Sequence, residues 1–139
     1  MNAKAFHYLS LARKARLIEA GEEPVGAVCR AQKARLVLLA GDASPHTYRR
    51  AKSFVAGTKQ PLIQLDCTKD DLGTAIGYSA CAILAITDVR LALAFVMALD
   101  DPKHAELLAD LEVRAARADQ RQKEEKAHRN NIRRGKKKK

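Results

Sequence analysis

The side chains that most directly suggest chemistry are the cations of the last fourteen residues. Residues 126–139 carry eight Lys or Arg and no Asp or Glu. A block of like charges repels itself and stays solvated, and its usual partner is a polyanion. The cations we expect on nucleic-acid phosphates are Arg129, Arg133, Arg134, Lys136, Lys137, Lys138 and Lys139. About six such contacts would make log K fall against log salt concentration with a slope of about −4 to −5.

Side chains that could support catalysis are present but isolated. Asp42 and Asp88 follow apolar runs, where catalytic acids often stand in α/β folds, yet neither has a histidine or second carboxylate at a recognisable spacing. Turn and cap roles are the simpler interpretation. Neither G-x-x-x-x-G-K-[ST] nor G-x-G-x-x-G occurs, so no phosphate-cradling loop is expected. The sequence therefore predicts no catalysis, no cofactor and no small-molecule substrate.

The cysteines and histidines do not have the spacing of a metal site. Cys29, Cys67 and Cys81 form no C-x-x-C pair, and the histidines add no closely spaced ligands. Small buried hydrophobic residues in a reducing compartment explain these cysteines best. The chain opens without a long apolar stretch, and its most apolar region, 78–99, is interrupted by two charged residues. We expect no metal, no membrane association and a cytoplasmic location.

Charge divides the 139 residues into three parts. Residues 1–99 hold 13 basic and 8 acidic side chains, and residues 100–125 hold 5 and 8, so the excess of positive charge is concentrated in the tail. The length suits one domain with an appendage. We predict a domain over 1–99, a helical extension over 100–125 and a disordered basic tail over 126–139.

Hydrophobic periodicity and capping residues predict alternating helices and strands. The predicted helices open at Asn2, Glu22, Ser44, Thr68, Val89 and Asp101. The predicted strands are apolar runs at 17–19, 36–40, 61–65 and 82–87. Short connections between alternating helices and buried strands favour a three-layer α/β/α sandwich with a small sheet. The helix opened by Asp101 has only a narrow apolar stripe, so it should lie loosely on the body or project from it and fray near Glu125.

Four segments, in their order along the chain, resemble one known family. They are Gly21-Glu22-Glu23 at a helix start, the run from Ala34 to Pro45, the run from Asp71 to Gly77, and Ala85-Ile86-Thr87-Asp88. Together they resemble the ribosomal L7Ae/L30e family of small RNA-binding proteins, and most of all its bacterial L7Ae-like members, over roughly residues 4–99. The resemblance implies an L30e-like fold and a structured RNA as partner, foremost ribosomal RNA, with association with the ribosome and translation.

The resemblance also implies a mode of binding. In archaeal and eukaryotic members the second helix enters a kink-turn, a bent RNA with tandem G·A pairs, where an Asn, a Glu and a Lys read base edges. These positions fall here on Glu23, Pro24 and Ala27, so this set is replaced. An apolar loop that packs on a flipped-out nucleotide falls on residues 77–81, where Tyr78 could stack on a base.

The predicted RNA site combines this turn, this loop and nearby cations. Besides the tail, it consists of Lys14, Arg16, Gly21, Glu22, Glu23, Arg30, Lys33, Tyr78, Ser79 and Ala80. The four cations in this set flank the Gly21 turn in sequence and could contact phosphates. The alternative for Glu22 and Glu23 is that they only complement the dipole of the helix they open.

Two other functions are compatible with the same sequence. One is a protein-interaction module that touches RNA only through its basic tail, for which the replaced Asn/Glu/Lys set would be the signature. RNA binding that vanishes with the tail would favour it. The other is a fragment of an RNA methyltransferase, since L30e-like domains precede some of these enzymes. No S-adenosylmethionine-binding half follows within these 139 residues, which argues against it.

Overall fold

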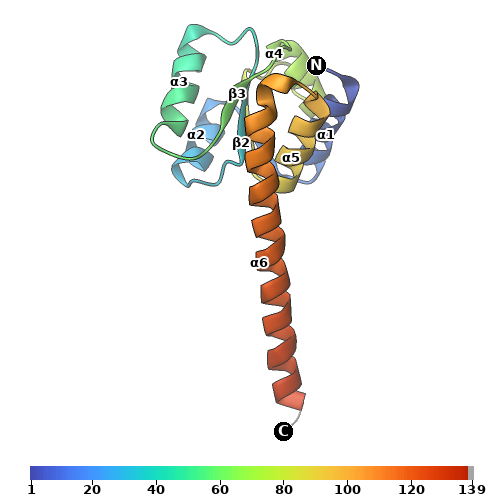
Figure 1. Ribbon diagram of the computed structural model, residues 1–139. Helices are drawn as coiled ribbons and strands as arrows, with labels where there is room; N and C mark the ends of the chain where they lie inside the picture. Colours follow the sequence, from blue (N-terminus) through green and yellow to red (C-terminus); the bar gives the residue numbers. More distant parts are fainter. Residues whose placement is uncertain (138–139) are drawn as a thin grey trace.

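The structure, a computed structural model, describes residues 1–137, with side-chain surroundings through Arg133; Lys138 and Lys139 lie outside the described residues. Four strands form one sheet in the order β1-β4-β2-β3 (Figure 1). They are β1 (Ile18–Ala20), β2 (Leu36–Leu39), β3 (Leu62–Gln64) and β4 (Ile83–Ile86). Strand β4 runs antiparallel to both of its neighbours, whereas β2 and β3 are parallel.

The helices begin where their capping residues predict. They are α1 (Ala3–Lys14), α2 (Glu22–Arg30), α3 (Pro45–Val55), α4 (Lys69–Ile76), α5 (Val89–Leu99), the 3₁₀ turn η1 (Pro102–His104) and α6 (Ala105–Lys137). Side chains of Asn2, Ser44, Thr68, Asp88 and Asp101 each accept a backbone N–H from the turn that follows. Each such bond satisfies a donor that would otherwise lack an intrahelical partner.

The helices cover both faces of the sheet, because alternate strand residues point to opposite sides. Val37, Leu39, Ile83 and Ala85 pack on one side with α2 and α3. The opposite set of strand residues packs with α1, α4, α5 and the first turns of α6. The predicted three-layer α/β/α sandwich is therefore confirmed. The body of Figure 1 shows these layers edge-on.

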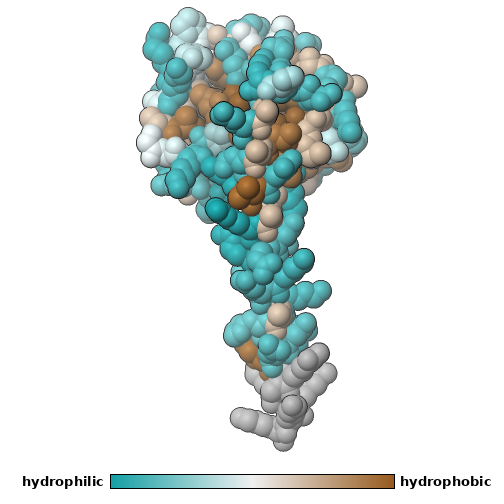
Figure 2. Space-filling view, in the orientation of Figure 1, coloured by the Kyte–Doolittle hydropathy of each residue, from teal (hydrophilic) through white to brown (hydrophobic). Residues whose placement is uncertain are grey.

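Helix α6 is attached to the body at one end and projects from it at the other (Figure 1). Leu111 and Ala115 are buried in the core shared with α5, so the first turns of the expected extension belong to the domain. Beyond them the helix is covered almost entirely by hydrophilic residues, as Figure 2 shows. A helix that is polar all round has no face to bury against a neighbour.

The expected disordered tail differs from the structure, in which α6 continues to Lys137. The helix is already nucleated by packed turns, and extending an existing helix is far easier than starting one. Residues 126–137 contain no proline, and Lys, Arg and Ala are good helix formers. Glu125 also precedes Arg129 by four residues, the favourable order for an acid and a base on one helix face.

None of the helices in the part of the chain that the structure describes has both the length and the apolar character needed to cross a bilayer.

Candidate nucleic-acid interface

The start of α2 is joined directly to the start of β4. Gly21 has a positive φ of 99°, a backbone conformation that residues other than glycine rarely adopt. This conformation lets the chain turn from β1 into α2. Its N–H donates to the carbonyl oxygen of Ile83, at 3.0 Å. The Cys81 thiol lies at the same place, donating to that same carbonyl at 3.2 Å. The helix start and the residues before β4 are therefore neighbours.

The exposed side of α2 carries the positions that correspond to base-reading residues in the family it resembles. Val25 and Cys29 are buried against the sheet, and Gly26 is buried against Phe54 of α3. Glu23, Pro24, Ala27 and Arg30 are exposed. Glu23, Ala27 and Arg30 are spaced by four and three residues and Pro24 adjoins Glu23, so the four lie along one broad side of the helix. This side offers one carboxylate near the helix start and one guanidinium near its end.

The loop of residues 77–81 is held tightly against α4. Gly77 ends α4 in the left-handed conformation, with φ of 79°. The Tyr78 N–H then bonds back to the Gly73 carbonyl at 2.8 Å. A Cβ on Gly73 would come within 2.7 Å of the Cα of Ala80, so only glycine lets the loop lie this close. This close approach accounts for a glycine in the interior of a helix.

Tyr78 is the aromatic residue that this loop presents to solvent, with 41% of its surface exposed. The Arg13 guanidinium lies over its ring, 5.2 Å from the centroid. A cation over an aromatic face is attracted by the ring quadrupole. Arg13 is not among the sequence-predicted site residues. The cluster Arg13-Lys14 at the end of α1 indicated a cationic patch, but nothing in the sequence joined it to a loop more than sixty residues away.

Glu22 is engaged within the protein. Its carboxylate accepts a hydrogen bond from the Thr47 hydroxyl at 2.9 Å and lies 3.2 Å from Nε of Arg50. Both partners belong to α3, so Glu22 ties the two helices on this face of the sheet together. Glu23, next in the chain, is exposed and makes no ion pair within the described residues. The two adjacent acids therefore have different surroundings.

The predicted cations do not gather around the Gly21 turn. Arg16 precedes β1 beside Leu17, whose carbonyl accepts from Thr87 just after β4 ends. Lys33 lies near the start of β2, which pairs with that same end of β4. Both cations are thus at the edge of the sheet opposite the turn, a strand length or roughly 10 Å away. These two cations flank the turn in sequence, but an intervening strand or helix carries each of them to the other end of the sheet.

Arg30 and Lys14 are exposed but are placed differently from one another. Arg30 ends α2, about 12 Å along the helix axis from its start. Lys14 stands in the last turn of α1, one residue after Arg13. Ser79 and Ala80 are exposed beside Tyr78. Of the predicted set, the structure thus brings together the α2 start and the loop of residues 77–81.

The predicted tail cations lie on the far part of α6. Arg129 and Arg133 are exposed, and with Lys126 and Asn130 they border a shallow hollow of about 250 Å³. Arg134, Lys136 and Lys137 continue the helix, while Lys138 and Lys139 are outside the described residues.

The strand-end acids and the cysteines have structural environments. Asp42 accepts from the Lys69 N–H at 2.7 Å, and Asp88 caps α5, as turn and cap chemistry predicts. Cys29, Cys67 and Cys81 are free and buried. Burial raises the pKa of each of the three thiols above its ordinary value of 9.0. Among the described residues, no group of His, Cys, Asp or Glu is arranged to hold a metal ion.

Comparisons with known proteins agree with this geometry. Residues 3–95 match the profile of the ribosomal protein L7Ae/L30e/S12e/Gadd45 family. The chain is 34% identical over 95 residues to the RNA-binding protein YlxQ of Bacillus subtilis (strain 168), an alignment that covers 68% of this chain and 94% of that protein. A solved structure of a protein of unknown function from Bacillus halodurans C matches with a TM-score of 0.66 and 26% identity, covering 72% of this chain and all of the other. The family match ends before α6.

Proposed function

The chain belongs to the ribosomal protein L7Ae/L30e/S12e/Gadd45 family, and from this premise we propose that it is a non-enzymatic RNA-binding protein that docks on bent, structured RNA. A relative that shares 34% of the aligned residues is named an RNA-binding protein. The proposed partner is ribosomal RNA or another RNA with a kink-turn-like internal loop. The proposed setting is the cytoplasm, in association with the ribosome or with translation.

The start of α2 supplies the phosphate contact in this proposal. The first backbone N–H groups of a helix have no intrahelical acceptor and point outward with a partial positive charge. Helix α2 has no side-chain cap, because its N-cap residue is Gly21. Gly21 donates its N–H to Ile83 and Pro24 has none, so the N–H groups of Glu22 and Glu23 are those available to an anionic oxygen, as in phosphate binding by helix N-termini.

The loop of residues 77–81 supplies the base contact. Bent RNA presents unstacked bases that an aromatic side chain can cover. Tyr78 is exposed, and Arg13 beside it adds a planar cation. The observation that carries the proposal is the direct bond from Gly21 to Ile83, because it sets the α2 start next to the loop that ends at Cys81. One RNA bend can then reach both.

The residues at the three base-reading positions of α2 determine how well the protein can distinguish one RNA sequence from another. Glu23 is exposed and can accept from the N–H groups of a guanine edge, whereas Pro24 and Ala27 offer no side-chain donor or acceptor. Recognition therefore depends on the shape of the bend, on stacking and on phosphates. We expect a preference for bent internal loops over straight duplex, with little discrimination among loops of different sequence.

Six large hydrophobic residues of the described chain are exposed, and they are distributed over several elements. They are Leu11, Tyr48, Tyr78, Met97, Val113 and Ile132. These belong to α1, α3, the 77–81 loop, α5 and α6. A protein-binding surface is normally a contiguous apolar patch with a polar rim.

Crosslinking in cells followed by sequencing of the bound RNA tests the proposal. The expected result is enrichment of a small number of sites centred on bent internal loops, with ribosomal RNA prominent. The Tyr78→Ala variant, expressed at the same level, should lose this enrichment. An even distribution of crosslinks over unstructured RNA would contradict the proposal.

A further inference from the structure

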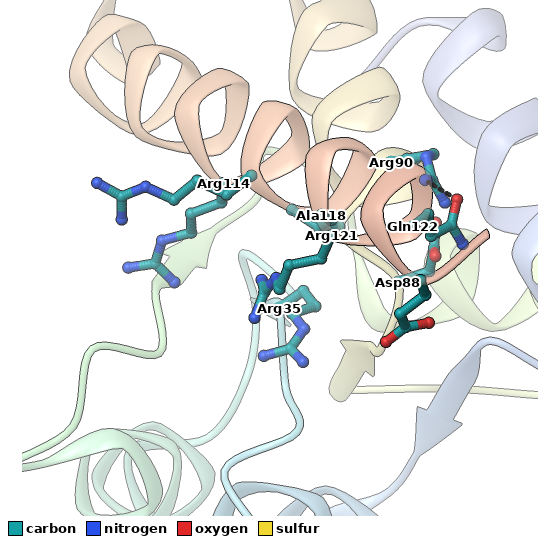
Figure 3. A pocket seen from close by; sticks show the side chains of 10 residues that line it. Arg35, Asp88, Arg90, Arg114, Ala118, Arg121 and Gln122 are labelled. Carbon is teal, nitrogen blue, oxygen red and sulfur yellow. Dashed lines mark hydrogen bonds between the residues drawn. The ribbon is translucent and has the colours of Figure 1, made fainter. Parts of the chain in front are cut away.

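A second cationic feature lies at the opposite edge of the sheet from the α2 start. Here α6 passes the end of β4 and the start of β2, leaving an open hollow of about 520 Å³ (Figure 3). We call it the arginine hollow, after its lining arginines Arg35, Arg90, Arg114, Arg117 and Arg121. Figure 3 shows the Arg121 side chain extending from α6 toward Arg35, so cations from two separate elements share one space.

Much of the positive charge in the arginine hollow is not compensated within the protein. Arg90 pairs with Asp119 and also donates to Gln122. Arg114 pairs with Asp110 at 2.8 Å and donates to the Lys59 carbonyl at 2.9 Å. For Arg35, Arg117 and Arg121, no ion pair is found within the residues that the structure describes.

The acids that line the hollow do not replace these missing partners. Only two line it, against five arginines. Asp88 also caps α5 through the Leu91 N–H, and Glu125 is exposed. A capping carboxylate keeps its negative charge, so three guanidinium groups without an ion pair share this space with two carboxylates, and a net positive charge remains. Like charges held together repel each other unless an anion lies between them.

Both walls of the hollow are fixed by buried contacts. Arg35 donates its backbone N–H to the Ile86 carbonyl at 2.8 Å. The residue before it, Ala34, is held by the buried Gln60 side chain at 3.0 Å. On the other wall, Leu111 and Ala115 anchor α6 in the core. The arginines thus extend from a rigid frame, which lowers the entropy lost when they bind a ligand.

We propose that the arginine hollow is a second RNA-binding site that holds backbone phosphates of the duplex flanking the bent loop; this rests on the proposed function. Guanidinium forks match phosphate oxygens in a bidentate manner. A polymer is favoured over a small phosphate because, beyond the acids Glu124 and Glu125, further cations follow along α6 at Lys126, Arg129 and Arg133. The two sites at opposite edges of the sheet then hold two stretches of one RNA.

The test uses the full chain and two labelled RNAs of equal length, a hairpin with a bent internal loop and a fully paired hairpin. Binding is measured by fluorescence anisotropy over a range of KCl concentrations for wild type, Arg117→Gln/Arg121→Gln and Tyr78→Ala. The matched control, Arg49→Gln/Lys123→Gln, removes two exposed cations that do not line the hollow. Glutamine keeps the helix propensity of α6, and thermal unfolding checks that every variant folds.

The hollow variant should weaken binding to both RNAs alike and reduce the magnitude of the salt slope by about 1.5–2, whereas the control should change the slope by much less. Tyr78→Ala should instead remove the preference for the bent loop and leave the slope unchanged. If the hollow variant behaves like the control, the hollow is not an RNA-binding site, and the proposed function is unaffected. The wild type could instead bind both RNAs equally well, while the hollow variant still reduces the salt slope. That result would overturn the proposed function and keep the hollow as an RNA-binding site.

The source of the phosphate is tested in a second arm. Calorimetry measures binding of inorganic phosphate and of ATP to wild type and to the hollow variant. The proposal expects binding no tighter than millimolar for both. Micromolar ATP binding that the hollow variant loses, with the salt slope for RNA unchanged, would reassign the hollow to a small phosphorylated ligand and overturn the proposal.

Discussion

The guanidinium of Arg13, in the last turn of α1, lies 5.2 Å from the ring centroid of Tyr78, in the loop before β4. The contact places a cation and an exposed aromatic face side by side at the loop before β4. An aromatic ring with one free face is suited to stack on an unpaired base. Its partner Arg13 keeps the ring in position and adds positive charge for the adjoining phosphate.

Replacing Tyr78 by alanine should weaken binding to RNA with a bent internal loop. Base–aromatic stacking contributes about 1–3 kcal/mol, so the dissociation constant should rise roughly 5- to 150-fold. Tyr78→Phe should keep most of the affinity, because it keeps the ring. Tyr48→Ala is the matched control, since Tyr48 is similarly exposed, at 37% against 41%, and also lies beside a cation, Lys52. Equal losses for Tyr78→Ala and Tyr48→Ala in a filter-binding assay would refute the assignment.

Removing the charge of Arg13 should have a smaller effect in the same direction. A cation–π contact at an exposed site contributes about 0.5–1 kcal/mol, which corresponds to a roughly 2- to 5-fold loss of affinity for Arg13→Gln. The control is Lys4→Gln, an exposed cation in the first turn of the same helix. If both variants bind equally well by anisotropy, Arg13 has no part in the site.

The adjacent acids Glu22 and Glu23 should contribute differently to the stability of the fold. Glu22→Ala leaves the Thr47 hydroxyl and Arg50 without their partner on α2, and should lower the free energy of unfolding by about 1–2 kcal/mol. Glu23→Ala removes an exposed side chain and should change it by less than about 0.5 kcal/mol. Urea unfolding followed by circular dichroism measures both. The reverse order of stabilities would show that the described pairing between α2 and α3 is incorrect.

Adding one methyl group at Gly73 should displace the RNA-contacting loop. The new Cβ would meet backbone atoms of Ala80 within 3 Å, and the backbone must move. We expect Gly73→Ala to destabilise the protein by about 1–3 kcal/mol and to weaken RNA binding. Thr74→Ala, at the exposed neighbouring position, is the control and should be nearly neutral. Unchanged melting temperature and affinity for Gly73→Ala would argue against the tight loop.

The three cysteines should be unreactive while the protein is folded. Burial raises the pKa of Cys29, Cys67 and Cys81, so the reactive thiolate is scarce at pH 8. The unfolded chain loses these protons near pH 9 and the folded chain only at higher pH, so the folded state is the more protonated between the two values. The thiols' contribution to stability is therefore complete below about pH 9 and falls as pH rises further. A thiol-specific dye should label the cysteines only in denaturant; rapid labelling of native protein would contradict their burial.

Local signals in the sequence were sufficient for most of the fold. Side-chain caps such as Asn2 and Thr68 act within four residues, and the apolar runs of buried strands need no distant information. The RNA-binding role predicted for the α2 start and for the 77–81 loop followed from the family resemblance. The other residues of the site were harder to predict, because their positions depend on which strand ends lie at the same edge of the sheet.

Arg16 and Arg35 illustrate the part that could not be predicted. Arg16 is five residues from Gly21 in sequence, but strand β1 carries the chain to the opposite edge of the sheet. Arg35 was not singled out, because one cation before a strand is usually only solvated. Its meeting with Arg121 depends on where α6 crosses the sheet, and a helix with so narrow an apolar stripe does not reveal its docking angle in its sequence.

Competition binding between the two RNAs addresses the central proposal most directly. Wild-type protein is bound to a labelled hairpin with a bent internal loop, and either the same unlabelled hairpin or a fully paired hairpin of equal length is added. The account predicts that the bent RNA competes at least about tenfold better, a difference of about 1.4 kcal/mol. Equal competition by the two RNAs, or no binding of either at low salt, would contradict it.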